Sequence, residues 1–208
     1  NVQATVPSKE KTYLASMGIY IFDAPVIEGL LQESDSTDFG KEIIPDAIGK
    51  CHTHAYIFDG YWEDIGTIRS FYDCNIALTE FKPAFNFYDE DQPIFTHMRN
   101  LPPSKINRAT IEQSLTSEGC IISDCKLTKS VIGVRSIIEK GSELEGVIMM
   151  GSDFYENKEA RDLNDKQGIP HVGIGKNCKI RETIIDKDAH IGNNVRINVD
   201  GKKYEDGD

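Results

Sequence analysis

The sequence predicts a two-part protein in which an α/β segment is followed by an all-β parallel coil of hexapeptide repeats. Three observations support this prediction. Strand-like and helix-like runs alternate up to residue 81, residues 82–105 are rich in proline and aromatic side chains, and from residue 106 on aliphatic residues recur every five or six positions. A six-residue period fits neither an amphipathic helix nor a hairpin sheet. It is typical of a parallel coil with a triangular cross-section.

The first region alternates strands and helices, as α/β domains do. In chain order we expect a buried strand over residues 13–22, a helix from Pro25, a short helix over residues 38–44, a strand over residues 54–58 and a helix from Thr67. Thr37 or Asp38 can cap the short helix, and Thr67 can cap the last one, because their side-chain oxygens accept from the first free backbone amides.

Residues 82–105 are expected to be a linker between residues 1–81 and the coil of residues 106–208. The aromatic and aliphatic side chains of the linker would be costly to leave in water. We therefore expect an extended segment that packs on its neighbours and not a disordered spacer.

Two blocks of the coil repeat one spacing. In each block five aliphatic residues are separated by six, five, six and six positions, and the blocks align with an offset of 53. We expect these residues to point inward, one for each side of each turn, in a left-handed coil. They are Ile121, Leu127, Ile132, Ile138 and Leu144, then Ile174, Ile180, Ile185, Ile191 and Ile197. The charged residues 153–168 between the blocks predict a loop that leaves the coil and is helical in part.

The composition excludes several classes of partner. The formal charge is -11, from 34 acidic and 23 basic residues. Nucleic acids and anionic membranes require clustered Lys and Arg, so neither partner is expected. No apolar run is long enough to span a bilayer. The five cysteines lack CxxC spacing, which favours free thiols in a reducing compartment and thus a soluble intracellular protein.

The segment Tyr61-Trp62-Glu63-Asp64-Ile65-Gly66-Thr67 is the strongest candidate for chemistry. It follows a strand-like run and leads into a helix, so the carboxylate of Asp64 is expected at the mouth of that helix. There it can face a cation such as Mg²⁺, while Trp62 stacks on a sugar. Taken alone, the same residues are also compatible with a helix-capping acid and a core tryptophan.

Six motifs in a fixed order favour the chemical interpretation. They are Ala15–Tyr20, Asp38-Phe39-Gly40 with Ile44-Pro45, Gly60–Thr67, Leu101–Lys105, Gly151–Tyr155 and Ile184–Lys187. The series resembles the glucose-1-phosphate adenylyltransferase family, which makes ADP-glucose and pyrophosphate from ATP and glucose 1-phosphate for glycogen or starch synthesis. The resemblance covers nearly the whole chain. It implies the C-terminal part of a Rossmann-like nucleotidyltransferase domain over residues 1–81, followed by a left-handed parallel β-helix.

The resemblance also implies roles for particular residues. The residues expected to line the glucose 1-phosphate pocket are Ser16, Tyr20, Asp38, Phe39 and Trp62. Asp64 matches a metal-binding aspartate of the family and is expected to be the catalytic residue that holds Mg²⁺. Arg99 matches an arginine that contacts anionic small-molecule effectors. A homo- or hetero-tetramer is implied, in bacterial cytoplasm or in the plastid stroma.

Several motifs of the family are not found in this sequence. They are the Gly-rich phosphate loop, an upstream aspartate for the first metal position and a Glu-Lys-Pro segment, all of which precede the position of Ser16 in the family. We therefore expect a fragment that holds the sugar half of the site and not the ATP half. By itself it should have no adenylyltransferase activity.

Three alternatives remain open. Relatives that use uridine or guanosine nucleotides are disfavoured by the amino-acid sequence of residues 60–67 and by the Pro-Pro-Ser-Lys segment. A hexapeptide acyltransferase would use a histidine base, for which His190 in the coil is the candidate. A non-catalytic regulatory subunit is compatible with the sequence, because the catalytic partners of Asp64 lie outside the chain.

Overall fold

The computed structural model describes residues 15–32 and 38–199. These residues form two compact units that divide between Trp62 and Glu63. Each unit is described by itself. All five cysteines are free thiols, as expected. In the described part of the chain, no helix has the length and apolar character that a bilayer crossing requires.

The first unit is helical. Its elements are α1 (Ala24–Gln32), the π-helical turn η1 (Phe39–Ile43) and α2 (Ile44–Lys50). Leu30, Ile43 and Ala47 form a small core, against which Phe22 and Ile27 pack. The expected helices at Pro25 and over residues 38–44 are confirmed, and the second continues into α2.

The prediction of two strands in this unit is wrong. The segment from Ala15 to Phe22 and the segment from His54 to Phe58 are extended but form no strand; residues 13 and 14 lie outside the described residues. A strand needs a neighbour to accept and donate its backbone hydrogen bonds, and the described residues of this unit offer none. Most of their aliphatic and aromatic side chains are accordingly open, with Ile21 98% and Tyr56 86% exposed.

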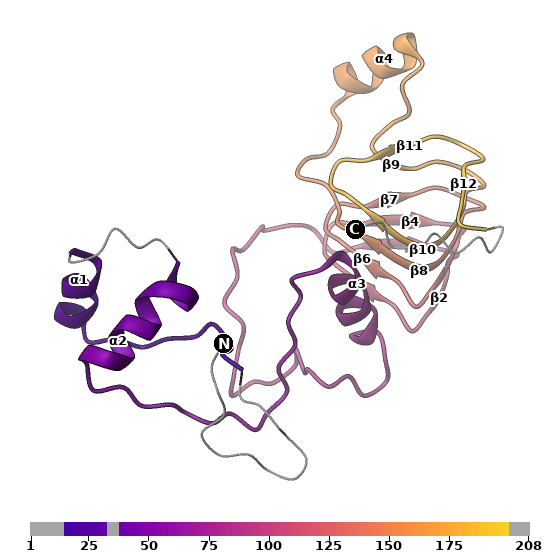
Figure 1. Cartoon of the computed structure of the whole chain (residues 1–208). Helices are drawn as coiled ribbons and strands as arrows, with labels where there is room; N and C mark the ends of the chain where they lie inside the picture. Colours follow the sequence, from indigo (N-terminus) through magenta and orange to yellow (C-terminus); the bar gives the residue numbers. More distant parts are fainter. Residues whose placement is uncertain (1–14, 33–37, 200–208) are drawn as a thin grey trace. The chain divides into compact units, whose positions relative to one another are not determined.

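The second unit is built around a coil of parallel strands with three sides (Figure 1). One side consists of β1 (Lys105–Asn107), β4 (Ile121–Ser123), β7 (Ile137–Ile138), β9 (Gly173–Ile174) and β11 (His190–Ile191). The next side consists of β2 (Thr110–Glu112), β5 (Lys126–Thr128), β8 (Glu143–Met149), β10 (Lys179–Ile185) and β12 (Arg196–Ile197). The third side is made of β3 (Leu115–Thr116), β6 (Val131–Ile132) and the second halves of β8 and β10.

The interior of the coil is filled by stacked aliphatic side chains. Each of the three sides contributes one continuous stack, and the paired residues are Ile122–Ile138–Ile174–Ile191, Leu127–Leu144–Ile180–Ile197 and Ile132–Met149–Ile185. Nine of the ten residues predicted to point inward are buried or pack on this core. These repeated apolar contacts between successive turns stabilise the coil by removing aliphatic surface from water.

The tenth prediction, Ile121, is wrong. Ile121 is 39% exposed, whereas its neighbour Ile122 is 0% exposed. Successive side chains of a strand point to opposite faces, and the two isoleucines are equally apolar, so spacing alone does not distinguish them. The pairing of Ile122 with Ile138 decides which one faces inward.

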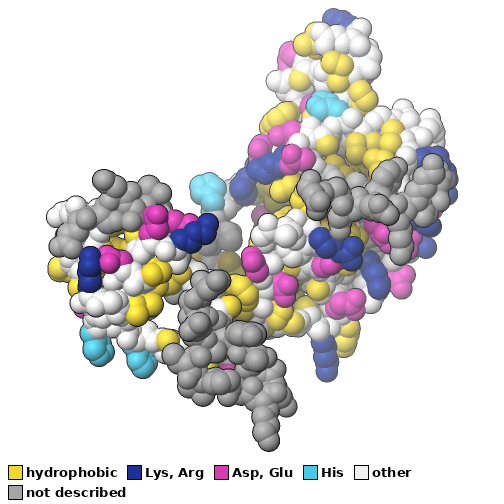
Figure 2. Space-filling view, in the orientation of Figure 1, with side chains coloured by type: hydrophobic (Ala, Val, Ile, Leu, Met, Phe, Trp, Pro, Cys, Tyr) yellow, Lys and Arg dark blue, Asp and Glu magenta, His cyan; other side chains and the backbone are white. Residues whose placement is uncertain are grey.

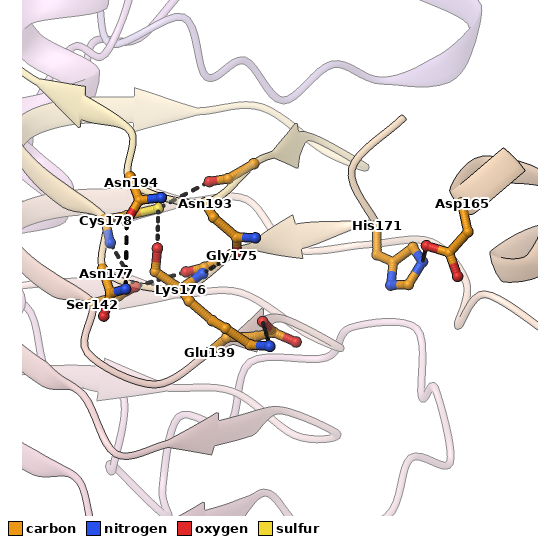
Figure 3. Close-up of polar contacts among 11 residues, drawn as sticks. Glu139, Ser142, Asp165, His171, Gly175, Lys176, Asn177, Cys178, Asn193 and Asn194 are labelled. Atoms are coloured by element: carbon orange, nitrogen blue, oxygen red, sulfur yellow. Dashed lines mark hydrogen bonds and ion pairs between the residues drawn. The ribbon is translucent and has the colours of Figure 1, made fainter. Parts of the chain in front are cut away.

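The corners of the coil use left-handed backbone conformations. At one corner the positive-φ residues of five successive turns are Gln113, Lys129, Gly146, Glu182 and Asn198. At another they are Arg108, Asp124, Gly141, Asn177 and Asn194. Figure 3 shows Asn177 and Asn194 next to each other at this corner. The side-chain amide of Asn177 donates a hydrogen bond to Oδ1 of Asn194 at 3.4 Å. Asparagine tolerates this conformation better than most residues.

The chain leaves the coil between β8 and β9 and forms α4 (Lys158–Gln167), which confirms the predicted partly helical loop. Asn157 caps α4, and Gly168, in the left-handed conformation, ends it. Both carboxylate oxygens of Glu156 close the base of the loop: one accepts from the side chain of Asn164 and the other from the backbone of Val172. Figure 1 shows α4 standing away from the coil.

The helix α3 (Ile68–Ala77) also belongs to the second unit and lies against β8. Thr67 caps it as predicted, in a reciprocal capping box with Ser70. Residues 82–104 follow without helix or strand and lead into β1.

Candidate functional site

Three of the predicted sugar-phosphate residues lie together in the first unit. The Ser16 hydroxyl is 2.8 Å from the Tyr20 hydroxyl. The Tyr20 ring in turn stacks on the Phe39 ring, with centroids 6.4 Å apart and an interplanar angle of 19°. Each of these side chains remains partly open to solvent. An aromatic surface edged by hydroxyls can bind a pyranose, because it covers the apolar face of the sugar while the hydroxyls bond its rim.

A third ring, which the sequence analysis did not single out, completes this surface. Phe22 lies 6.5 Å from Tyr20 and 6.3 Å from Phe39, measured between centroids. It also packs against the small core of the unit. Phe22 follows Tyr20 by two positions, and in an extended segment such residues face the same way; that spacing is the signal that could have identified it.

Asp38 has a structural task next to this surface. Its Oδ1 accepts a hydrogen bond from the backbone of Lys41 at 2.9 Å and so caps η1. The ammonium of Lys41 lies 3.8 Å from Oδ2 of the same carboxylate. Both groups are largely exposed, so this ion pair contributes little to stability. The predicted sugar contact of Asp38 remains a prediction, since capping explains the residue equally well.

The boundary between the two units falls inside the Trp-Glu-Asp segment. Trp62 ends the first unit with 43% of its surface exposed. Glu63 begins the second unit, in which Oδ1 of Asp64 accepts a hydrogen bond from the backbone of Gly66 at 3.0 Å. That Trp62 and Asp64 face one cavity, with the sugar and the metal ion meeting there, remains a prediction.

Arg99 lies in a group of basic side chains on the second unit. The ammonium of Lys187 donates a hydrogen bond to Asp153 at 2.9 Å. This bond, with the charges of Lys187, Arg99 and Arg135, holds the pKa of the Asp153 carboxyl below its ordinary value. Arg135 is fixed by a bond to the backbone of Ser152. The sequence analysis missed Lys187 and Arg135 as neighbours of Arg99, and no periodic signal relates these three positions.

His190, the candidate base of an acyltransferase, is engaged by the loop that leaves the coil. Its Nδ1 contacts the carbonyl oxygen of Pro170. Figure 3 shows the adjoining region, where Nε2 of His171 lies 3.0 Å from the carboxylate of Asp165 and Lys176 pairs with Glu139 at 4.0 Å. The ring nitrogen that His190 gives to Pro170 is therefore not available to an acceptor substrate.

The outer surface of the coil carries mixed charge. Figure 2 shows Lys and Arg interspersed with Asp and Glu over the visible face of the second unit. Two ion pairs on this surface link β10 to β8. Lys179 lies 3.2 Å from Glu143, and Arg181 lies 3.1 Å from Glu145. Within the described ranges no three His, Cys, Asp or Glu side chains converge on one point.

Comparison with known proteins agrees with both halves of the fold. The Nucleotidyl transferase family model matches residues 6–81, and the model of the GLGC left-handed parallel beta-helix domain matches residues 99–208. The chain is 48% identical over 199 residues to the glucose-1-phosphate adenylyltransferase small subunit, chloroplastic/amyloplastic, of wheat (Triticum aestivum). The match covers 93% of this chain and 42% of that relative.

A nucleotidyltransferase segment joined to a left-handed parallel β-helix defines the class of protein. Within that class the sequence identity decides the family. The chain belongs to the glucose-1-phosphate adenylyltransferase family. The chain spans less than half of the length of the curated relative that it matches.

Proposed function

We propose that this chain supplies the sugar-phosphate side of an enzyme that makes ADP-glucose and pyrophosphate from ATP and glucose 1-phosphate. The observation that carries the proposal is the grouping of Ser16, Tyr20 and Phe39. These residues stand at positions where the family resemblance expects the glucose 1-phosphate pocket. A stacked pair of rings beside two hydroxyls has the chemistry to hold a hexose.

Asp64, in the second unit, is proposed to hold Mg²⁺ in the same reaction. When bound, Mg²⁺ would neutralise negative charge on the phosphates during nucleotidyl transfer. The hydrogen bond from Gly66 orients the Asp64 carboxylate through Oδ1. Since no cluster of three acidic or metal-ligating side chains lies in the described ranges, the other ligands would be phosphate oxygens and groups outside them.

The catalytic proposal is tested by placing the 208 residues into the wheat small subunit in place of the matching segment. This chimera should make ADP-glucose, whereas the chain alone should not. Asp64→Asn in the chimera should lower kcat at least ~100-fold, because the metal loses a charged ligand. Asp59→Asn provides a matched control, removing a nearby carboxylate outside the motif. Equal activity of the two variants would reject the role of Asp64.

Glucose 1-phosphate binding has its own test in the isolated chain. Trp62 is the single tryptophan, so its fluorescence reports on one position. We expect glucose 1-phosphate to change this fluorescence in a saturable way, and Phe39→Ala to weaken the binding. Ile48→Ala is the control, since Ile48 is 59% exposed and lies outside the motif. A response that is identical for galactose 1-phosphate would argue against a glucose pocket.

Arg99 is proposed to contact an anionic effector. Support comes from the basic neighbours Lys187 and Arg135, which act on the same carboxylate as Arg99. In the chimera, inorganic phosphate, used as a simple anionic probe, should shift the activity, and Arg99→Gln should reduce that shift. Arg69→Gln, on α3, is the control. An unchanged response in Arg99→Gln would reject this contact.

The chain is also proposed to act as one subunit of a tetramer, and in a plastid. The wheat relative is named a small subunit and is described as chloroplastic/amyloplastic, which supports both proposals. Static light scattering of the chimera tests the assembly. A chimera that is monomeric at micromolar concentration and still active would reject it.

A further inference from the structure

The helix α3 is tied to the coil by one tyrosine. The hydroxyl of Tyr72 donates a hydrogen bond to the carbonyl oxygen of Gly146 in β8, at 2.7 Å. Burial, with the negative charges of Glu182 and Asp73, raises the pKa of this hydroxyl. It therefore remains a protonated donor throughout the neutral range.

Gly146 is an exception in its corner of the coil. In the same corner the other turns carry a side chain in the left-handed conformation: Gln113, Lys129, Glu182 and Asn198. Only Gly146 has none, and a Cβ at that position would lie 2.8 Å from the Tyr72 hydroxyl oxygen. The left-handed backbone conformation alone does not require glycine here, since four other turns adopt it with a residue that has a side chain. The missing side chain makes room for Tyr72.

The corners on either side of Gly146 also face the α3 segment. The ammonium of Lys129 lies 3.9 Å from the carboxylate of Glu80, shortly after α3 ends. The charge of Glu182 reaches the Tyr72 hydroxyl from the following turn. Two successive turns of the coil therefore contact the same short stretch of chain, through Lys129 and Gly146, and the charge of Glu182 acts on it from the third turn.

The other end of α3 is joined to Asp64 by local hydrogen bonds. The backbone of Ser70 donates to the Thr67 hydroxyl at 3.0 Å, and the backbone of Thr67 donates to the Ser70 hydroxyl at 3.1 Å. The backbone of Gly66 donates to Asp64 at 3.0 Å. These bonds leave little freedom between the carboxylate and the helix, so a displacement of α3 also displaces Asp64.

We propose that Tyr72 is a positioning residue, which holds the carboxylate of Asp64 at a fixed place relative to the β-helix through its hydrogen bond to Gly146. This inference rests on the proposed metal-binding role of Asp64. Mg²⁺ demands near-ideal octahedral geometry, and small misplacements of a ligand weaken catalysis strongly. Through this contact the coil would influence how well Asp64 could hold the metal.

The first test measures the motion of backbone amides in the 208-residue chain by NMR relaxation. In the wild type, the amides of Gly66 and Ser70 should move with the coil. In Tyr72→Phe they should gain nanosecond motion while the coil amides do not change. Tyr88→Phe is the control, because Tyr88 is 81% exposed. Gly146→Ala tests the same contact from the other side, and urea unfolding verifies that each variant folds. Unchanged motion of Gly66 in both Tyr72→Phe and Gly146→Ala would overturn the proposal.

The second test measures the Mg²⁺ concentration for half-maximal activity in the wheat chimera. Tyr72→Phe should raise it about fivefold, the factor that corresponds to one hydrogen bond of ordinary strength. The Michaelis constant for ATP at saturating Mg²⁺ should not change. A purely structural role would lower the amount of active enzyme and leave the Mg²⁺ requirement as it was, which would overturn the proposal. Full activity of Asp64→Asn would instead overturn the role of Asp64, independently of the contact between Tyr72 and Gly146.

Discussion

The hydroxyl of Tyr155 donates a hydrogen bond to the carbonyl oxygen of Gly119 at 2.7 Å, and this contact fastens the beginning of the extruded loop to an earlier turn of the coil. The same tyrosine lies under Arg135, whose guanidinium carbon is 6.0 Å from the ring centroid. Gly119 has a φ of 73°. A Cβ there would lie 2.4 Å from the Tyr155 hydroxyl oxygen.

Gly119→Ala should therefore destabilise the coil in two ways. The left-handed conformation costs about 1–2 kcal/mol for alanine, and the clash with Tyr155 adds about 1–3 kcal/mol. Gly168→Ala is a matched control, because Gly168 has a φ of 68° but nothing within 4 Å of its added Cβ. Urea unfolding should show the larger loss for Gly119→Ala. Equal losses for both variants would mean that the Tyr155 contact does not constrain this turn.

The two adjacent isoleucines of β4 allow a direct test of which one faces the core. Ile122→Ala removes a side chain with 0% exposure and should cost about 2–5 kcal/mol of unfolding free energy. Ile121→Ala removes one that is 39% exposed and should cost less than about 1 kcal/mol. The reversed order of the two losses in urea unfolding would place Ile121 inside.

The sequence predicted the coil well because its rule is local and repeated. Each turn places an aliphatic side chain on each side, so the period is visible in the sequence before the chain leaves the coil for α4 and resumes after it returns. The exception, Ile121, concerns two equivalent neighbours, and only the pairing of Ile122 with the next turn separates them. Helix caps such as Thr67 were predictable for the same reason, since a cap acts within one turn.

The candidate site was only partly predictable. Motif positions identified Ser16, Tyr20 and Phe39, which the structure brings together. Tyr72 could not be identified in this way, because its partner Gly146 is 74 positions away and no local spacing relates the two residues. The expected strands failed because strand formation depends on a neighbouring strand and not on the apolar run itself.

Two substitutions of Asp38 should distinguish a helix-capping role from a sugar-binding role. Asp38→Asn keeps a side-chain oxygen that can accept from Lys41, so the first unit should lose less than about 0.5 kcal/mol of stability. Asp38→Ala removes the cap and should cost about 1 kcal/mol. If Asp38 also contacts the sugar through its charge, both variants should bind glucose 1-phosphate more weakly in the Trp62 fluorescence assay. Normal binding by Asp38→Asn would leave capping as the function of the residue.

The buried thiol of Cys125 should make the coil sensitive to alkaline pH. Burial, with a smaller contribution from the charge of Asp124, raises the pKa of this thiol from 9.0 to about 11. The folded state thus holds the proton more tightly than the unfolded state. Its stabilising effect is complete below pH 9 and is lost as the pH rises through about 11. Burial also raises the pKa of the Cys120 thiol, which acts in the same direction.

The measurement is the midpoint of urea unfolding between pH 8 and pH 11 for the wild type and for Cys125→Ala. The variant loses some packing and should be less stable at pH 8, yet its stability should fall less steeply above pH 9, because one of the linked protons is gone. Cys51→Ala is the control, since Cys51 is only partly buried and lies in the other unit. Parallel pH profiles for the wild type and Cys125→Ala would show that this thiol is not linked to folding, and that the coil opens in alkali for another reason.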